Sequence, residues 1–280
     1  MYPYLIKWGG FFIPAYPIIY GLAITMGGVV LLWLGRKEGL PPQKLVHTIP
    51  IVAVSCVLGG RLFYVLHFPG DFQGIWGAFD LSHGGQVFYG GLLLGIPAVI
   101  LLCKLSKLPW VIMLDLTAVS APAGLALGRW ACFCRGCCYG RITDLPWAVK
   151  FPKHVDIYGD IVGSPAFISH LHQELITKTD MYSLPIHPAQ IYSSLFSIGV
   201  FLVMIWLWKT KRARGKLWLA YLVFYSGTRF TVEFFRENQM AFANLTVAQV
   251  FSIVIGISAG SILLITHNKI RKKIMPCTIR

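Results

Sequence analysis

The sequence predicts an all-α polytopic membrane protein with about seven transmembrane helices and a small extracytoplasmic subdomain. Of its 280 residues, 56% are hydrophobic and only 13% are charged. A soluble globule of this size needs more polar surface than these residues supply. The bilayer is therefore the expected solvent of this chain.

Seven apolar stretches reach the length of a membrane-spanning helix, which needs about 20 mostly apolar residues. The third and fourth are short and are separated by Lys104, Lys107 and Pro109, so a re-entrant hairpin is an alternative for that pair. The first lacks a clear small-residue cleavage site and is expected to be a retained helix. The predicted spans are residues 16–35, 47–66, 86–103, 110–127, 190–208, 217–235 and 246–265.

The net charge of +14 gathers in short basic clusters between the apolar stretches. These clusters fall on alternate connections and at the C-terminus, as the positive-inside rule predicts for cytoplasmic segments. The pattern places the N-terminus outside and the C-terminus inside, and it argues against nucleic acid as a partner. The basic residues are Arg36, Lys37, Lys44, Lys104, Lys107, Lys209, Lys211, Arg212, Arg214, Lys216, Lys269, Arg271, Lys272 and Lys273.

One long connection, residues 128–189, lies between the fourth and fifth predicted spans on the outer side. It contains His154, His170 and His172 together with many Gly and Pro residues. We expect it to form an extracytoplasmic subdomain inserted into a single transmembrane domain, residues 1–280. No internal repeat is visible, which argues against an inverted-repeat transporter.

Three arginines lie in or at the end of apolar stretches, where an ionisable group needs a partner, a cavity or a function. They are Arg61, Arg129 and Arg229. Glu233 lies one helical turn after Arg229, so these two side chains can pair. Structural pairing or snorkelling would explain any one of these arginines, but three together favour an anionic ligand. A planar guanidinium suits phosphate, and a lipid headgroup supplies one at the outer membrane face.

Paired glycines recur in the same regions. Small residues allow helices to pack closely, and they also let a backbone approach a ligand. Packing is the simpler interpretation. These glycines are Gly59-Gly60, Gly84-Gly85 and Gly90-Gly91, with Gly136 further along the chain.

Four thiols lie within seven residues, at Cys132, Cys134, Cys137 and Cys138. They suit a soft metal together with a histidine, a redox pair or a nucleophile. Their spacing fits no common zinc pattern, and adjacent Cys137 and Cys138 are awkward ligands for one tetrahedral ion. Small residues packed near a membrane site are the simpler interpretation, so we predict no metal and no other cofactor.

A polar motif, His187-Pro188-Ala189-Gln190-Ile191-Tyr192, opens the fifth predicted span. It places an imidazole, an amide and a phenol at the outer entrance of that helix. Helix capping and interface anchoring would account for these side chains as well as a site would.

Taken in order, these motifs resemble the prolipoprotein diacylglyceryl transferase family. The resemblance runs from Tyr20 to the seventh predicted span and so covers nearly the whole chain. Its matching segments are Tyr20-Gly21, Gly59-Gly60-Arg61-Leu62, Gly84-Gly85, Tyr89-Gly90-Gly91, the stretch from Gly128-Arg129 through Gly140-Arg141, the His187 motif, and Gly227-Thr228-Arg229-Phe230 through Glu233-Phe234-Phe235-Arg236-Glu237.

The resemblance implies an enzyme of the bacterial cytoplasmic (inner) membrane. Such enzymes move the diacylglyceryl group of phosphatidylglycerol to the lipobox cysteine thiol of prolipoproteins and release glycerol phosphate. The implied partners are therefore phosphatidylglycerol, a prolipoprotein signal peptide and membrane lipids. This chemistry requires a cationic pocket for the phosphate and a route to a thiolate.

The resemblance also implies roles for particular residues. Arg129 and Arg229 match arginines expected to bind phosphate, and Glu233 would orient Arg229. Tyr89 and His187 are candidate proton acceptors. The further residues expected to bind substrate are Tyr20, Arg61, Gly90, Gly91, Cys132, Arg135, Gly140, Gln190 and Tyr225.

The chain departs from the family pattern at several polar positions. Tyr89 stands where the family commonly has a histidine, and a tyrosine with a pKa of about 10 is a weak base at neutral pH. Cys132 and Arg135 replace two asparagines, Cys137 replaces a glutamate, and Ser193 stands where a glutamate is usual. The arginines thus favour an anionic lipid, whereas the altered polar residues leave the base open.

Two other functions remain compatible with these residues. One is a paralogous membrane transferase that uses the same lipid pocket with a different acceptor, through Cys132 or Cys137 as a covalent relay. The other is a non-enzymatic lipid or thiol-metabolite transporter, or a metal-binding membrane protein. Few charges along the spans and the absence of visible repeats argue against the latter.

Overall fold

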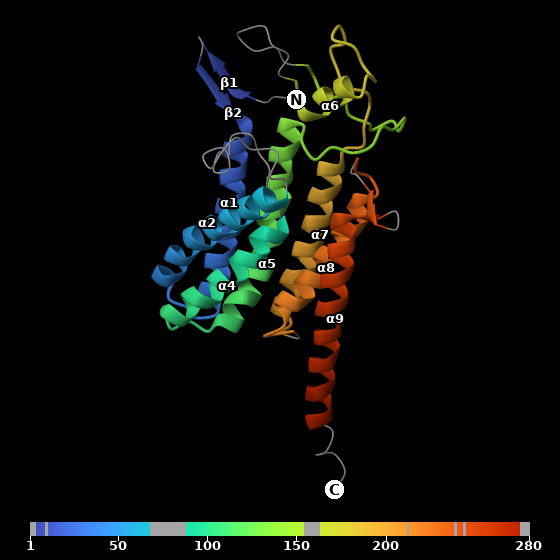
Figure 1. Cartoon of the computed structure of the whole chain (residues 1–280). Coiled ribbons are helices and arrows are strands. Elements are labelled where there is room, and N and C mark those ends of the chain that lie inside the picture. The colour runs from blue at the N-terminus through green and yellow to red at the C-terminus, as the bar shows by residue number, and fades with distance from the viewer. Residues whose placement is uncertain are drawn as a thin grey trace. The chain divides into compact units, whose positions relative to one another are not determined.

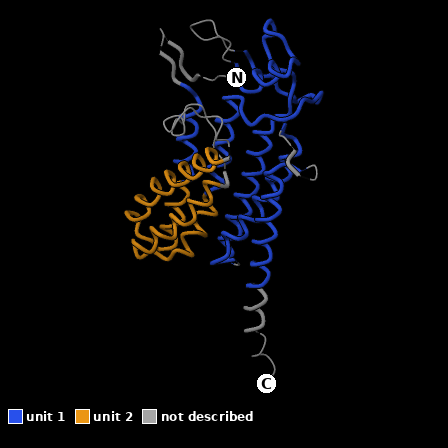
Figure 2. The backbone as a smooth tube through the Cα atoms, viewed as in Figure 1, with its two compact units in different colours: residues 1–27, 121–280 blue, residues 28–120 orange. Residues whose placement is uncertain are grey.

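The computed structural model describes residues 4–8, 11–67, 88–153, 163–211, 213–237, 240–242 and 245–274. The chain divides into two compact units, which Figure 2 shows in different colours. Residues 1–27 and 121–280 form one unit, and residues 28–120 form the other. Gly84, Gly85 and His154 lie outside the described residues.

Seven long helices in the described residues follow the predicted apolar stretches in order (Figure 1). Five of them, α1, α2, α5, α7 and α9, are long and apolar enough to cross a membrane. Helix α4 adds a shorter apolar segment, Gly90–Leu105. The chain is therefore an α-helical polytopic membrane protein. The helices are α1 Ala15–Lys37, α2 Pro42–His67, α4 Phe88–Leu105, α5 Trp110–Arg135, α7 Ala189–Lys209, α8 Leu217–Glu233 and α9 Val247–Ile274.

Helix α5 extends eight residues beyond the predicted end at residue 127 and stops at Arg135. Arg129 and Cys132 therefore lie on a helix, although hydropathy falls there. The residue that follows the helix, Gly136, has a φ of +77° and donates its N–H to the carbonyl oxygen of Cys132 at 2.9 Å. A left-handed glycine of this kind is a common helix C-terminus.

Short elements lie outside the long helices. Strands β1 Tyr4–Trp8 and β2 Phe11–Pro14 form one antiparallel pair, and β3 Met240–Phe242 and β4 Leu245–Thr246 form another. Helix α6 Pro165–His172 begins with Pro165 at its first position. The Oγ of Ser164 accepts a hydrogen bond from the N–H of Phe167 at 3.4 Å and so caps this helix.

The connection between α5 and α7 has a small hydrophobic core of its own. Phe151, Ala166 and Ile186 are fully buried, and Phe133 and Tyr139 pack against them. Isolated β-bridges join Ile186 to two earlier positions of the same connection. These contacts hold α6 and the segment before α7 against the end of α5.

In the unit of residues 1–27 and 121–280, α7 packs against α8, and α8 packs against α9. The Oγ of Ser194 on α7 donates a hydrogen bond to the carbonyl oxygen of Ala126 on α5 at 2.8 Å. Many large apolar side chains stay exposed on the outer helix faces; Leu202 and Leu264, for example, are 59% and 66% exposed. Such faces are typical of helices that contact lipid.

In the unit of residues 28–120, two helix backbones approach closely. A Cβ atom at Gly59 of α2 would overlap the carbonyl oxygen of Gly90 of α4, and one at Gly90 would overlap that of Gly59. A Cβ at Gly91 would lie 2.9 Å from the carbonyl oxygen of Cys56. Gly90 and Gly91 thus serve helix packing, as small residues do in membranes.

We expect Gly59→Ala to destabilise the protein by about 1–3 kcal/mol, because the added methyl group must push α2 and α4 apart. Gly199→Ala in α7 is the matched control, since no atom lies within 4 Å of a Cβ at Gly199. Thermal unfolding in detergent measures both variants. Equal midpoints for the two would contradict the close helix contact.

Candidate active site

The centre of the site is a buried carboxylate at the C-terminal end of α8. Glu233 is 2% exposed, and its Oε2 lies 2.9 Å from Nη1 of Arg229. The structure thus confirms the pair that the four-residue spacing predicted. Arg236, just beyond the helix, places its Nη1 3.7 Å from the same oxygen. One carboxylate therefore serves two guanidinium groups.

The N-terminus of α9 supplies the other partner of this carboxylate. The hydroxyl of Thr246 donates a hydrogen bond to Oε1 of Glu233 at 3.0 Å. The N–H of Gln249 donates to the Thr246 hydroxyl oxygen at 3.2 Å, and the N–H of Thr246 donates to Oε1 of Gln249 at 2.9 Å. This reciprocal arrangement is a capping box, and it fixes the Thr246 hydroxyl for Glu233.

Arg129 on α5 belongs to the same site. Electrostatic interactions link its guanidinium with Arg229 and with the phenol of Tyr225 on α8. The fold therefore brings together three residues that the sequence analysis placed at a substrate site. Because two guanidinium groups repel each other, their proximity favours an anion between or beside them.

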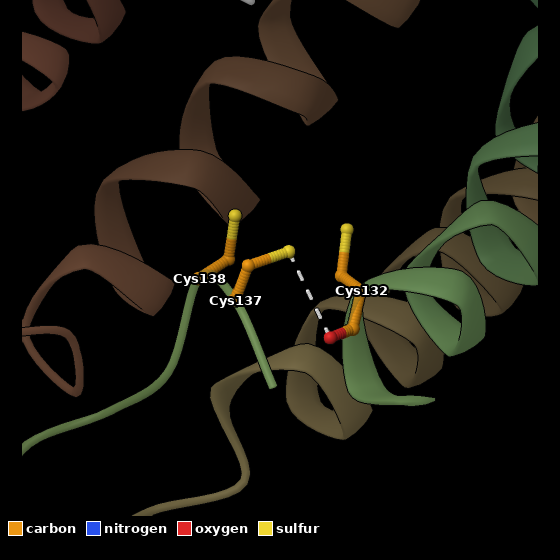
Figure 3. Close-up of side chains that lie close together, drawn as sticks. All are labelled: Cys132, Cys137 and Cys138. Carbon is orange, nitrogen blue, oxygen red and sulfur yellow. Dashed lines mark hydrogen bonds between the residues drawn. The ribbon is translucent and has the colours of Figure 1, made fainter. Parts of the chain in front are cut away.

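Three of the four clustered thiols meet next to Arg129. The Sγ atoms of Cys132, Cys137 and Cys138 all lie within 4.8 Å of one another, and Figure 3 shows them gathered together. The thiol of Cys137 donates to the carbonyl oxygen of Cys132 at 3.8 Å. Cys138 has a left-handed φ of +58°, so the side chains of two adjacent residues can turn towards the same sulfur.

The environment of Cys138 favours its thiolate. Hydrogen bonds from the thiols of Cys132 and Cys137 hold the pKa of Cys138 well below its usual range, and the charges of Arg236 and Arg129 lower it further. Burial opposes this shift. The Cys138 sulfur therefore ionises more readily than an ordinary cysteine thiol.

The loop that carries the thiols is fixed by the start of α7. Nε2 of Gln190, a buried residue, donates to the carbonyl oxygen of Cys137 at 2.8 Å. The N–H of Gly140 donates to the carbonyl oxygen of His187 at 3.1 Å. A Cβ at Gly140 would lie 2.5 Å from that oxygen, so only glycine fits there. Gln190 and Gly140 therefore act on the loop backbone.

His187 contacts aromatic side chains. Its Nδ1 lies 3.3 Å from the hydroxyl of Tyr192, and its ring centroid lies 5.4 Å from that of Phe235. Burial and the charge of Arg141 lower the pKa of His187 below its usual value. The imidazole is therefore neutral at pH 7 and able to accept a proton.

Two tyrosines of α1 extend the site. The rings of Tyr16 and Tyr20 stack with centroids 5.8 Å apart, and the guanidinium of Arg135 lies 5.2 Å from the centroid of Tyr16. Electrostatic interactions link the Tyr16 phenol with Cys132. Tyr16 was missed by the sequence analysis, although its position four residues before Tyr20 places both on one helix face.

Arg236 and Cys138 were also given no individual role from the sequence. The position of Arg236, three residues after Glu233, was the available signal for a second cation on that carboxylate. The sequence contained no such signal for Cys138. Its side chain lies near Cys132 only because Cys138 has a left-handed backbone conformation, which is not expected for a cysteine.

Four predicted site residues belong to the unit of residues 28–120, namely Arg61, Tyr89, Gly90 and Gly91. Arg61 is 3% exposed, and its guanidinium lies 5.7 Å from the ring centroid of Tyr64. Gly90 takes part in the α2–α4 contact. Tyr89 lies in the first turn of α4, and its side chain is outside the described part of the structure.

An apolar pocket of about 270 Å³ lies between α1, α5 and α7. Its lining is almost entirely hydrocarbon, which suits an acyl chain better than a polar ligand. The lining residues are Met26, Ala123, Ala126, Leu127, Trp130, Ser194, Ile198 and Phe201.

The sequence matches the family model of prolipoprotein diacylglyceryl transferases over residues 3–266. Three curated relatives are named phosphatidylglycerol–prolipoprotein diacylglyceryl transferase. That of Ralstonia pickettii (strain 12J) is 33% identical, and the match covers 85% of this chain and 87% of the relative. Those of Methylobacillus flagellatus and Finegoldia magna are 31% and 27% identical and cover 78% and 91% of this chain. The resemblance of the motifs is thereby confirmed, and the chain belongs to the prolipoprotein diacylglyceryl transferase family.

Proposed function

We propose that this protein transfers the diacylglyceryl group of phosphatidylglycerol to the lipobox cysteine thiol of prolipoproteins and releases glycerol phosphate. The observation that carries this proposal is the pair of arginines, Arg129 and Arg229, beside the buried carboxylate of Glu233. Family membership supplies the class of reaction. The site supplies a reason why the donor is an anionic lipid.

Arg129 and Arg229 bind the phosphate of the lipid donor. Glu233 engages one amino group of Arg229, and a guanidinium has further N–H donors for phosphate oxygens. Negative charge grows on the phosphate as its bond to the glyceryl carbon breaks. Fixed cations in an apolar surrounding stabilise that charge strongly, so the pair lowers the barrier as well as binding the lipid.

The apolar pocket receives an acyl chain of the donor. Leu127 and Trp130 of its lining flank Arg129 on α5, so one lipid molecule can contact the pocket and the arginine together. Tyr16 and Tyr20, stacked on α1, contact lipid or peptide at the same end of the site. The lateral approach of both substrates from the bilayer fits an exposed apolar lining.

The charge pattern and the helix directions support one membrane topology. The C-terminal ends of α5 and α8 and the N-terminal ends of α7 and α9 all carry site residues, so the site lies at one end of these helices (Figure 1). Basic residues end α1 and α7. We therefore place seven spans in the bacterial inner membrane, with an outer N-terminus, a cytoplasmic C-terminus and residues 128–189 outside.

Transfer of label tests this function directly. Purified protein should move labelled diacylglyceryl from phosphatidylglycerol to a lipobox-bearing prolipoprotein, and the same acceptor with its cysteine changed to alanine should stay unlabelled. Label on the cysteine is expected. A folded preparation that binds the lipid and labels no cysteine would rule the proposed acceptor out.

We expect Arg229→Lys to lower kcat/KM by about 100-fold, which corresponds to ~2.7 kcal/mol. A lysine ammonium lacks the planar set of N–H donors with which a guanidinium can bind Glu233 and a phosphate oxygen at the same time. Arg36→Lys, at an exposed position in the last turn of α1, is the control and should keep full activity. Steady-state transfer kinetics measure both. Unchanged turnover of Arg229→Lys would remove this residue from the phosphate site.

We expect Tyr89→Phe to keep its transfer activity within about threefold. A phenol with a pKa of about 10 is almost fully protonated at neutral pH and is therefore a poor acceptor for the thiol proton. The transfer assay, run across a range of pH, measures this. A drop of more than tenfold in a folded variant would instead assign the proton acceptor to Tyr89. In that case the acid limb of the pH profile should also change.

A further inference from the structure

The cluster of Cys132, Cys137 and Cys138 has the donor set of a metal site. We propose that these three thiolates hold one Zn²⁺ ion and that the fourth position of the ion binds the thiol of the acceptor peptide. This inference rests on the proposed function for the identity of the acceptor. The metal site itself rests on the cluster.

The distances between the sulfur atoms suit one ion. Zinc binds thiolate sulfur at about 2.3 Å in a tetrahedral arrangement, which puts two ligand sulfurs roughly 3.8 Å apart. The three Sγ atoms already lie within 4.8 Å of one another. A small side-chain rotation therefore completes the site, and the backbone needs no rearrangement.

The positions of the ligands explain how adjacent cysteines share an ion. Cys132 lies in the last turn of α5, and Gly136 and Cys138 have positive φ angles. This turn brings Cys137 and Cys138 back to face Cys132, as Figure 3 shows. The objection that neighbouring residues are awkward ligands applies to an extended chain, where successive side chains point to opposite sides.

The cluster has three ligands, and no fourth histidine, cysteine or carboxylate joins it within the described part of the chain. Structural zinc sites are closed by four protein ligands, whereas catalytic sites keep one position open. A three-thiolate site thus has room for one more ligand. The soft sulfur of an acceptor cysteine is a suitable ligand for that position.

Zinc would provide the thiolate that the reaction needs. On binding zinc, the acceptor thiol releases its proton to solvent, since a coordinated thiol is deprotonated. Its sulfur then attacks the diacylglyceryl carbon bonded to the phosphate oxygen. The C–S bond forms, the C–O bond breaks with its electron pair going to oxygen, and glycerol phosphate leaves. The thioether product is uncharged and dissociates from the ion.

The neighbouring arginines fit both halves of this step. Arg129 and Arg236 interact electrostatically with Cys138, so they stabilise the excess negative charge of a zinc ion with several thiolates. Arg129 also interacts with Arg229, the second residue assigned to the phosphate. The zinc-bound acceptor sulfur and the phosphate of the donor would therefore both lie beside Arg129.

A disulfide explains the cluster less well. It would join two of the three sulfurs, would leave the third unpaired, and would need an oxidant. A single zinc ion uses all three thiols and needs no change of oxidation state.

Metal analysis and Co²⁺ substitution of the full-length protein in detergent test the proposal. We expect about one Zn²⁺ per chain after purification under reducing conditions. Replacement by Co²⁺ should give thiolate-to-cobalt charge-transfer bands. A lipobox peptide should change the cobalt spectrum, and the same peptide with serine for cysteine should leave it unchanged. These readouts use the unaltered protein and do not depend on turnover.

Cys132→Ser, Cys137→Ser and Cys138→Ser should each weaken zinc binding by at least tenfold, because one of three ligands is lost. Cys134→Ser is the matched control, since Cys134 lies in the same segment but outside the cluster. It should keep the metal.

Four results would each overturn the proposal. They are purified protein that contains no metal, copper in place of zinc, equal metal loss in Cys134→Ser, and a cobalt spectrum that does not change when the lipobox peptide is added. Full transfer activity in metal-free protein would overturn it while leaving the proposed function intact. A thiol-sensitive cobalt site in a protein that transfers no lipid would support the zinc site and would count against the lipid donor.

Discussion

A charge buried in a membrane protein must be balanced by opposite charges and hydrogen bonds, and the whole site depends on how Glu233 is balanced. Its partners are Arg229, Arg236 and the hydroxyl of Thr246. Without such partners a buried carboxylate would take up a proton, and the arginines would repel one another. The carboxylate thus ties the end of α8 to the start of α9. It also fixes one amino group of the Arg229 guanidinium through the ion pair.

Hydropathy predicted the long helices because the bilayer sets their length and composition. Most predicted boundaries lie within a few residues of the observed ones. Helices α5 and α9 are the exceptions, because they end eight and nine residues beyond the predicted spans. The last two turns of α5 carry Arg129 and Arg135, and the left-handed conformation of Gly136 decides where that helix ends. The short strands were not predicted. Strands of two to five residues leave little periodic pattern in a sequence.

The site was predictable where its residues are close in sequence. The spacing of Arg229 and Glu233 indicated their contact directly, and the His187 motif marked the start of α7. The link between Arg129 and Arg229 required the packing of α5 with α8, which a single sequence does not specify. The meeting of Cys132 with Cys138 required a left-handed residue at an unexpected position.

The thiol cluster and the phosphate compete for the same cations. Under the proposed function the donor phosphate would bind beside Arg129, where the environment of the Cys138 sulfur already favours a negative charge. Coulomb interactions are several-fold stronger there than in water, so this competition would weaken lipid binding. In the proposed zinc site, the divalent ion would offset two of the three negative charges on its thiolate ligands. The ion would thus leave the arginines available for the phosphate, and in the proposed step it would make the acceptor sulfur nucleophilic without a strong base at Tyr89.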